Sequence, residues 1–171
     1  MVKNLRRTIG NGVHFFGIQD SKFKTMRITL HFLLPMREKE IASNALLPFL
    51  MGRCCEEYPD FTQLSQQLDN LYGAGLSSDA GKLGDAQVLS YSVSGISSSY
   101  AFEGENMSQA LAGLLKGILF APAFENGIFR AEDLRQEKRQ LCELIDSEFN
   151  DKRIYAKRRC EELLHRGRPC G

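Results

Sequence analysis

The sequence lacks an excess of charge of either sign, and it lacks long apolar runs. Its 22 Lys and Arg residues balance 21 Asp and Glu residues, which gives a formal net charge of +1. Such a balance provides no strong field for nucleic acid or an anionic membrane surface. No apolar segment approaches the roughly 20 residues that span a bilayer, and the basic N-terminal residues precede no signal-peptide core. We therefore expect a cytoplasmic protein that binds neither membrane nor nucleic acid.

Regularly spaced cysteines are also lacking. The five cysteines are odd in number, irregularly spaced and without a C-x-x-C pair, which argues against a zinc ribbon or a thioredoxin-type redox site. Adjacent Cys54 and Cys55 do not easily bridge each other, so we expect free thiols in a reducing cytosol. A reactive thiol needs an exposed, electropositive setting. Arg53 is weak support for one, and two small residues at a helix end are the favoured interpretation.

Catalytic spacings are absent as well. No two of the histidines, His14, His31 and His165, have the three- or four-residue separation that places two ligands on one helix face. The glycines match neither a phosphate loop nor a dinucleotide fingerprint. The basic run at 157–159 is followed at once by acidic residues, which favours a solvated helix face over an RNA site. The residues alone predict no catalytic constellation.

What is present indicates a globular domain. With 171 residues and 43% hydrophobic content, the chain can form one domain with its own core, or one module of a longer protein. Strand-like alternation occurs at 12–19 and 25–34, and two or three further antiparallel strands are predicted between 75 and 101, with a turn near 82–85.

Helical patterns separate and follow these strands. One helix is expected from about Glu38, one after the cap Asp60, one from Asn106 to the stop at Pro122, and one long charged helix over 129–167 with a break near 150 and 151 as an option. The apolar stripes that we expect to be buried in the last three of these helices are Phe61, Leu64, Leu68 and Leu71; Leu111, Leu114, Leu115 and Ile118; and Leu134, Leu141, Ile145 and Phe149. The order predicts an α+β fold of two layers, a mostly antiparallel β-sheet with helices packed on one face.

The stretch ALLPFLMGRCC, residues 45–55, is unusual for a buried helix. Pro48 lies inside it, and a proline in a helix interior costs about 3 kcal/mol because it removes a donor and crowds the preceding turn. Gly52 then closes the apolar run just before the cysteine pair. Local chemistry gives no reason for this proline.

Several segments together resemble the N-terminal domain of the M16 peptidase family, the insulinase, pitrilysin and mitochondrial processing peptidase group. The similarity covers nearly the whole chain, and FENGIFRAEDLRQEK is its most specific piece. The closing HRGRPCG is similar to the H-P-Y-G ending of that family. The other matching segments are TMRITLHFLLP, ALLPFLMGRC, LDNLYGA and VLSYSVSG.

This resemblance implies that a zinc site has been lost. Active members carry H-x-x-E-H on the first helix, in which two histidines bind zinc and the glutamate activates water. The resemblance places Pro48 and Gly52 at the two histidine positions and Met51 at the base. None of the three holds a hydrolytic zinc ion, since Met51 is at best a soft thioether ligand. We therefore expect no cofactor and no catalytic residues here.

The long helix carries what remains of the family's acidic residues. Glu137 matches a family carboxylate near the site, and Leu144 falls at the position of the third zinc ligand, with Glu143 beside it in case of a one-residue slip. The resemblance places the chain with the bacterial, non-catalytic members that lack H-x-x-E-H.

The implied function is that of a non-catalytic subunit of a protease-like pair. Its partner would be an active M16-type protein or a second M16 domain, and extended peptides would bind by β-augmentation. The edge strand expected to receive them consists of Leu76, Ser77, Ser78, Asp79 and Ala80. Because the match ends at the H-P-Y-G-like point, we expect residues 1–171 to be a single domain, a fragment of a longer multi-domain chain.

Two other function classes remain open. The first is an active zinc-dependent endopeptidase whose ligands come from His14, His31, His165 and acidic residues. The second is a translation-linked or RNA-binding module that uses the basic face of residues 153–159.

Overall fold

The structure is a computed structural model that describes residues 2–167. Cys170 and the end of the HRGRPCG segment lie outside the described residues. The strands are β1 (Lys3–Gly10), β2 (Val13–Gln19), β3 (Thr25–Pro35), β4 (Gly75–Leu83) and β5 (Ala86–Ile96). The helices are α1 (Glu38–Met51), α2 (Phe61–Asn70), α3 (Met107–Phe120), α4 (Ala131–Ser147) and α5 (Lys152–Leu164).

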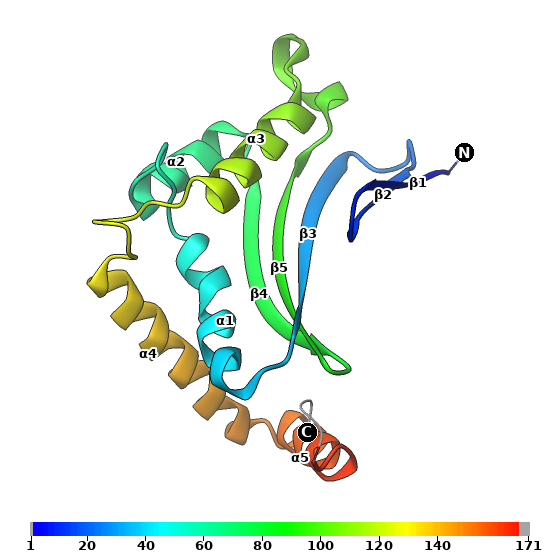
Figure 1. The fold of residues 1–171 in the computed structure, drawn as a ribbon. Coiled ribbons are helices and arrows are strands. Elements are labelled where there is room, and N and C mark those ends of the chain that lie inside the picture. The colour runs from blue at the N-terminus through cyan, green and yellow to red at the C-terminus, as the bar shows by residue number, and fades with distance from the viewer. Residues whose placement is uncertain (1, 168–171) are drawn as a thin grey trace.

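The main sheet has three strands in the order β3-β5-β4, and both pairings are antiparallel. Helices α1, α2 and α3 cover one face of this sheet, and α4 lies beyond α1 (Figure 1). The β4–β5 turn passes through Gly84, whose φ of +56° favours glycine. The predicted α+β fold, with helices on one face of an antiparallel sheet, is confirmed.

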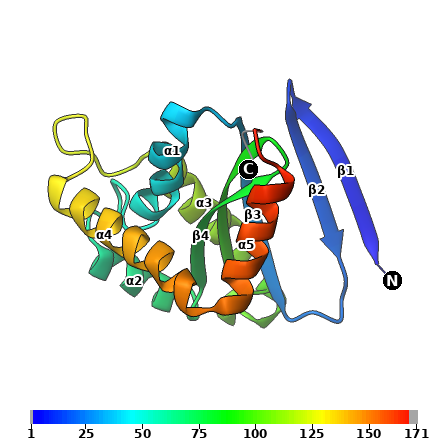
Figure 2. The ribbon, with the colours of Figure 1, turned by 90° about the horizontal axis from the view of Figure 1, so that it is seen from below.

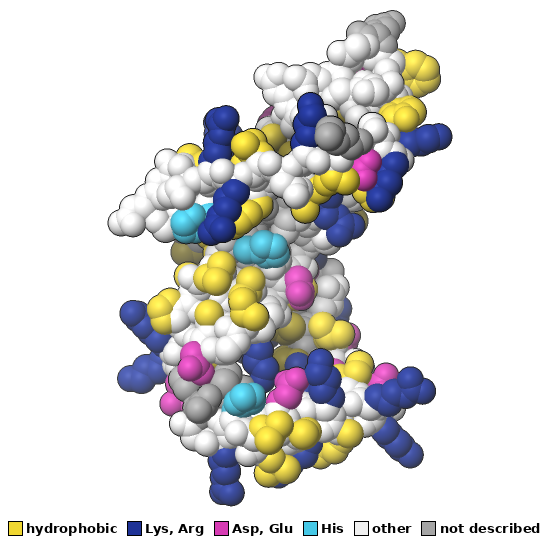
Figure 3. Space-filling view, turned by 90° about the vertical axis from the view of Figure 1, so that its right-hand side faces the viewer, with side chains coloured by type: hydrophobic (Ala, Val, Ile, Leu, Met, Phe, Trp, Pro, Cys, Tyr) yellow, Lys and Arg dark blue, Asp and Glu magenta, His cyan; other side chains and the backbone are white. Residues whose placement is uncertain are grey.

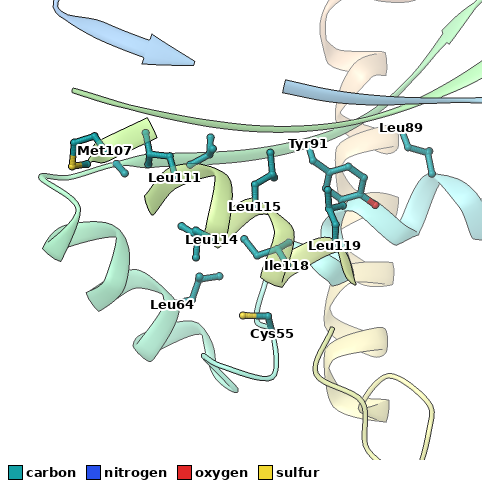
Figure 4. Packing of buried hydrophobic residues seen from close by; sticks show 12 residues of the cluster. Cys55, Leu64, Leu89, Tyr91, Met107, Leu111, Leu114, Leu115, Ile118 and Leu119 are labelled. Carbon is teal, nitrogen blue, oxygen red and sulfur yellow. The ribbon is translucent and has the colours of Figure 1, made fainter. Parts of the chain in front are cut away.

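The core lies between β5 and α3. Every second residue of β5 points inward, as period-two alternation requires, and Val93 is fully buried. Helix α3 packs its predicted apolar residues against this face of the sheet. Leu64 of α2 and Cys55 pack on the side of α3 that faces away from the sheet (Figure 4). The buried α3 residues include all four predicted ones, Leu111, Leu114, Leu115 and Ile118.

Two of the predicted helix caps are confirmed. The carboxylate of Asp60 accepts a hydrogen bond from the backbone N–H of Gln63 at 2.8 Å, and the Gln63 side chain donates to the same carboxylate at 2.8 Å. The side chain of Asn106 accepts from the Gln109 N–H at 3.1 Å. These bonds satisfy N–H groups that a helix start leaves free, so both helices begin where the sequence predicts.

Other expectations need correction. Phe61 is not buried with Leu64, because it sits at the first position of α2 and 62% of its surface is exposed. Of the two or three strands expected between 75 and 101, two are present, β4 and β5, and residues 98–100 form a short 3₁₀ turn. The optional break near 150 and 151 is also present, and Asp151 caps α5 there by accepting from the N–H groups of Arg153 and Ile154.

The predicted apolar stripe of α4 is largely at the surface. Leu141 is half-buried, whereas Leu134, Ile145 and Phe149 are 41%, 45% and 65% exposed. The buried side chain of α4 is instead Glu137. Apolar spacing therefore located the helix correctly but not its buried residue.

The N-terminal hairpin stands apart from the main sheet. Strand β1 is not among the elements expected from the sequence, and it pairs antiparallel with β2 as a separate two-stranded sheet. Figures 1 and 2 both show this hairpin set off from β3. No helix within residues 2–167 combines the length and the apolar character that crossing a membrane requires.

Candidate functional site

The end of α1 contains the three positions that the resemblance assigns to lost zinc chemistry. Pro48 lies inside the helix and is almost completely buried, yet the helix continues to Met51. The Pro48 carbonyl accepts from the Gly52 N–H at 3.0 Å, so hydrogen bonding resumes one turn later. The proline is thus tolerated as a buried core residue in the last turn of α1.

Met51 is held by the core rather than directed at a reactant. The hydroxyl of Tyr91 on β5 donates to the Met51 Sδ atom at 3.3 Å. Burial raises the pKa of Tyr91 to about 12, so the phenol stays neutral and remains a donor at ordinary pH. At the position that the resemblance assigns to the catalytic base, the chain has a sulfur that receives a hydrogen bond and cannot take a proton from water.

Gly52 lies against the edge strand β4. A Cβ atom added there would lie 2.6 Å from the Ser78 hydroxyl oxygen and 3.1 Å from the Pro48 carbonyl oxygen. Gly52 has an ordinary φ of −71°, so the glycine serves close approach and not a special backbone conformation. Helix α1 and strand β4 therefore meet at the position that the resemblance assigns to the second histidine.

Arg53 connects the end of α1 to α4. Its guanidinium donates to the Glu137 carboxylate at 2.6 Å and to the Gln136 side chain at 3.3 Å. Its Nε lies 3.1 Å from an Asp133 oxygen. Glu137 is only 7% exposed, and a buried carboxylate requires a partner of this kind. The buried Glu137 carboxylate is thus paired with an arginine of the same chain.

Arg130 extends the same ion-pair cluster. It lies 2.9 Å from Asp133, donates to the Cys54 sulfur at 3.3 Å and donates to the Pro59 carbonyl at 2.7 Å. Sequence reasoning missed this cluster because Arg53 and Glu137 are 84 positions apart. The spacing of Arg130, Asp133 and Glu137 on one helical face was the available signal.

The assigned third-ligand position, Leu144, and the neighbouring carboxylate, Glu143, are both exposed. Leu144 is 54% exposed on α4. Glu143 is exposed and forms a long ion pair with Arg139 of the same helix, at 3.7 Å. A one-residue slip in the resemblance therefore would not bring a buried carboxylate to the end of α1.

A cleft of about 310 Å³ opens beside Gly52 and Arg53. Its walls come from four elements, α1, α2, β4 and α4, and it is mostly apolar with the Arg53–Glu137 pair at one side. Phe61, which the sequence analysis expects in the core, is one of its walls. The remaining lining residues are Phe49, Leu64, Ser65, Leu68, Leu76 and Ser78.

The predicted peptide-binding residues lie on an edge strand. Strand β4 pairs with β5, and no other described strand pairs with it. Leu76, Ser78 and Ala80 are half-buried toward the helices, while Ser77 and Asp79 are exposed. In an antiparallel edge strand, alternate residues direct their N–H and C=O groups away from the sheet. Leu76 and Ser78 line the cleft, so this edge, which no described strand pairs, borders it.

The residues of the two alternative functions do not converge. His14 contacts Thr8 on β1, His31 contacts Ser90 on β5, and His165 follows α5. Within residues 2–167, no group of three or more His, Cys, Asp or Glu side chains is arranged to hold a metal ion. The basic run 157–159 is paired with Glu161, Glu148 and Glu162.

The cysteine pair lies in the core. Cys54 and Cys55 are 5% and 1% exposed, and burial is the main cause that raises the pKa of the Cys55 thiol. A buried thiol with a raised pKa is a poor nucleophile. This environment agrees with the interpretation of the pair as small core residues at a helix end.

Comparisons with known proteins support the α+β fold and a similarity to a protein named as an inactive metalloprotease. No protein-family model matches the sequence. The chain is 28% identical over 152 residues to a Bacillus subtilis (strain 168) protein named "Probable inactive metalloprotease YmfF", with 89% of this chain and 36% of the relative aligned. A crystal structure of a conserved protein from Enterococcus faecalis V583 superposes with a TM-score of 0.83 and 28% identity, over 93% of this chain and 37% of that one.

The chain therefore spans somewhat more than a third of the length of these relatives. It is similar to a bacterial protein named as an inactive metalloprotease, and it shares the α+β fold of the solved neighbour.

Proposed function

We propose that this chain is a non-catalytic M16-peptidase-like domain that binds extended peptides and acts beside a partner domain. The observation that carries the proposal is the position of the β4 edge. It borders an apolar cleft at the end of α1, where the assigned ligand positions are Pro48, Met51 and Gly52. A domain of this kind would hold a peptide without cleaving it.

The absence of catalysis follows from the chemistry of the side chains at these positions. Pro48 and Gly52 have no donor atom for zinc, and Met51 has no proton-accepting group. The nearest buried carboxylate, Glu137, is already engaged by Arg53 at 2.6 Å. A name given to a similar protein, "Probable inactive metalloprotease", supports the same proposal.

Peptide binding would use the backbone of β4 and the cleft beside it. An added strand gains hydrogen bonds along the edge, and every second side chain of the peptide would point toward the helix layer. The apolar walls of the cleft, among them Phe61 and Leu76, would receive such a side chain. The exposed residues Ser77 and Asp79 place no bulky group across the edge.

A proline scan of residues 76–80 tests the peptide site. Proline removes one backbone donor, so a substitution whose N–H points outward should abolish binding of an extended peptide and leave the fold intact. Proline at a position bonded to β5 should instead destabilise the sheet. Binding is measured by titrating labelled extended peptides, with circular dichroism as the folding check. Unchanged affinity in every folded variant would contradict the proposal.

Metal analysis tests the absence of catalysis. The purified chain is expected to contain no stoichiometric zinc by mass spectrometry and to show no chelator-sensitive peptide cleavage. Stoichiometric zinc together with cleavage would support the alternative, an active zinc-dependent endopeptidase. A salt-dependent mobility shift with RNA would instead support the RNA-binding alternative.

The proposal also includes a partner protein or domain. In a protease-like pair, the partner would carry the intact H-x-x-E-H motif that this chain lacks. Purification of the natural protein from its host, followed by identification of what accompanies it, tests this directly. Recovery without any M16-type protein or domain would count against the paired arrangement.

A further inference from the structure

The hairpin β1–β2 exposes apolar side chains that a folded domain normally buries. Two strands alone are marginally stable in water, yet these pair with each other and with no other described strand. None of their residues belongs to the core cluster. Figure 3 faces the side on which the hairpin lies and shows hydrophobic side chains at the surface. The exposed apolar residues of the two strands are Leu5, Ile9, Val13, Phe15, Phe16 and Ile18, between 45% and 80% exposed.

The two strands of the hairpin differ in charge. Strand β1 carries Lys3, Arg6 and Arg7, whereas β2 carries no Lys, Arg, Asp or Glu. Charged residues, lysine above all, protect the solvent edge of a sheet against pairing. The uncharged strand β2 is therefore the one suited to join another strand, and β1 is suited to remain outermost.

The same chain contains a sheet edge of the required kind. Strand β3 pairs with β5 on one side and with no described strand on the other. It is 11 residues long, and Arg27 is its single Lys, Arg, Asp or Glu residue. Phe32 and Leu33 are 37% and 61% exposed on it. A long, apolar edge strand with little charge is a template for strand addition.

The connection between β2 and β3 keeps the hairpin away from its own β3. Phe23 donates its N–H to the Asp20 carbonyl at 3.2 Å, and Lys22 pairs with the Asp20 carboxylate at 3.3 Å. Lys24 lies over the Tyr100 ring at 5.6 Å. The connection is thus folded, and both ribbon views show the hairpin beyond it (Figures 1 and 2).

We propose that β2 of one copy of this chain adds to the β3 edge of a second copy, so that two chains exchange hairpins reciprocally. Each three-stranded sheet then becomes five-stranded. The arrangement is closed by a two-fold axis, because each copy gives one hairpin and receives one. The connection of residues 20–24, with a fully extended span of about 20 Å, requires the two β3 strands to lie near each other.

A second copy is the preferred occupant because it supplies every surface that the hairpin needs. The donor strand and the acceptor edge are both on the described chain, and each has one edge that pairs with no described strand. Strand addition would place β2, which carries no Lys, Arg, Asp or Glu, beside the mostly apolar β3 edge of the second copy. The exchange forms this junction twice, each time with backbone hydrogen bonds along the paired strands.

The test measures the oligomeric state of the chain and of two matched variants. Asn4 and Ile18 are opposite each other in the hairpin register. Ile18→Asp places a charge on the pairing strand and is expected to raise the dimer dissociation constant about tenfold or more. Asn4→Asp places the same charge on the outer strand and is expected to leave that constant within about threefold. Light scattering coupled to size-exclusion chromatography over a concentration series gives both values.

Hydrogen exchange of the unmodified chain provides a readout that needs no variant. The amides of β2 and of the β3 edge are expected to exchange slowly in concentrated samples and quickly after dilution. A chain that stays monomeric at every concentration would overturn the proposal. So would a dimer that Ile18→Asp leaves unchanged, or hairpin amides that are protected equally at all concentrations.

Discussion

At the scale of single residues, Arg53 supplies the cation that the buried Glu137 carboxylate requires. The Arg53 guanidinium lies 2.6 Å from the Glu137 carboxylate. Such a cation is needed because burying an unpaired carboxylate costs free energy. The pair also joins α1 to α4, so it links two helices.

Replacing Arg53 tests this role. Arg53→Met removes the cation and leaves Glu137 buried without its partner, so we expect a loss of about 3–5 kcal/mol in the free energy of unfolding. Chemical denaturation followed by circular dichroism measures it. In the double variant Arg53→Met/Glu137→Met no charge is left unpaired, and most of the lost stability should return. Equal destabilisation of the single and double variants would contradict the explanation.

Gly52 and Ser78 form a second testable contact. Gly52→Ala places a Cβ atom 2.6 Å from the Ser78 hydroxyl oxygen, so we expect a stability loss of about 1 kcal/mol or more. Ser78→Ala removes that oxygen and should recover part of the loss when both changes are combined. Thermal unfolding of the four proteins in this cycle gives the coupling. Additive effects would show that the contact does not decide the choice of glycine.

The raised pKa of Tyr91 predicts that the folded protein loses stability at alkaline pH. Its ordinary pKa is 10.0 and burial raises the pKa in the folded protein to about 12. The folded state therefore keeps the proton where the unfolded state releases it, and the stabilisation is complete below pH 10 and lost as pH rises toward 12. Stability measured between these values should fall less steeply in Tyr91→Phe. Tyr58, whose pKa is also raised to about 12, remains in both proteins.

At the scale of elements, helix caps determine where helices begin, and sheet edges determine which further strands the sheet can bind. Asp60 and Asn106 set the starts of α2 and α3 through bonds to the N–H groups of Gln63 and Gln109. The edges decide what the sheet can still bind, because β3 and β4 each have one partner in the described sheet. The β4 edge borders the cleft, whereas the β3 edge is the more apolar one.

The Asp60 cap gives a prediction for α2. Asp60→Ala removes the acceptor for the Gln63 N–H and for the Gln63 side chain, so we expect a loss of about 1 kcal/mol. Asp60→Asn keeps an acceptor oxygen and serves as the matched control, with a loss of a few tenths of a kcal/mol. Denaturant unfolding measures both. A control as destabilised as the alanine variant would point to charge rather than capping.

At the scale of the whole molecule, stability is unevenly distributed. The buried side chains come mainly from β5 and α3, and α5 has no buried residue among those described. Helix α5 is held instead by surface ion pairs such as Lys82 with Glu161 at 3.8 Å, and such pairs contribute little.

Hydrogen exchange should reveal this gradient. We expect amides in β5 and α3 to exchange only through global unfolding, and amides in α5 to exchange through local opening at a much lower free energy. Mass spectrometry of exchanged peptides measures both. Raising the salt concentration should speed exchange in α5, because screening weakens its ion pairs. Equal protection of α3 and α5 would contradict this gradient.

Much of the architecture was predictable because local periodicity reports which side of an element is buried. The alternation of Leu89, Tyr91 and Val93 predicts the inner face of β5, and the three- and four-residue spacing in α3 predicts its buried stripe. Both patterns depend on residues close together in the chain. The composition of the α1 end likewise shows that Pro48, Met51 and Gly52 offer no zinc ligands.

Whether a side chain of an outer element is buried depends on which distant segments of the chain pack against it. Local sequence patterns do not contain that information. Leu134 and Phe149 have helical spacing, yet 41% and 65% of their surfaces are exposed, even though the centroid of the Phe149 ring lies 5.2 Å from that of Tyr155. Glu137 is charged, yet it is buried because Arg53, far away in the chain, meets it. Long-range contacts of this kind arise only when distant segments come together, and they decide the partner of a buried charge and the edges left open on the sheet.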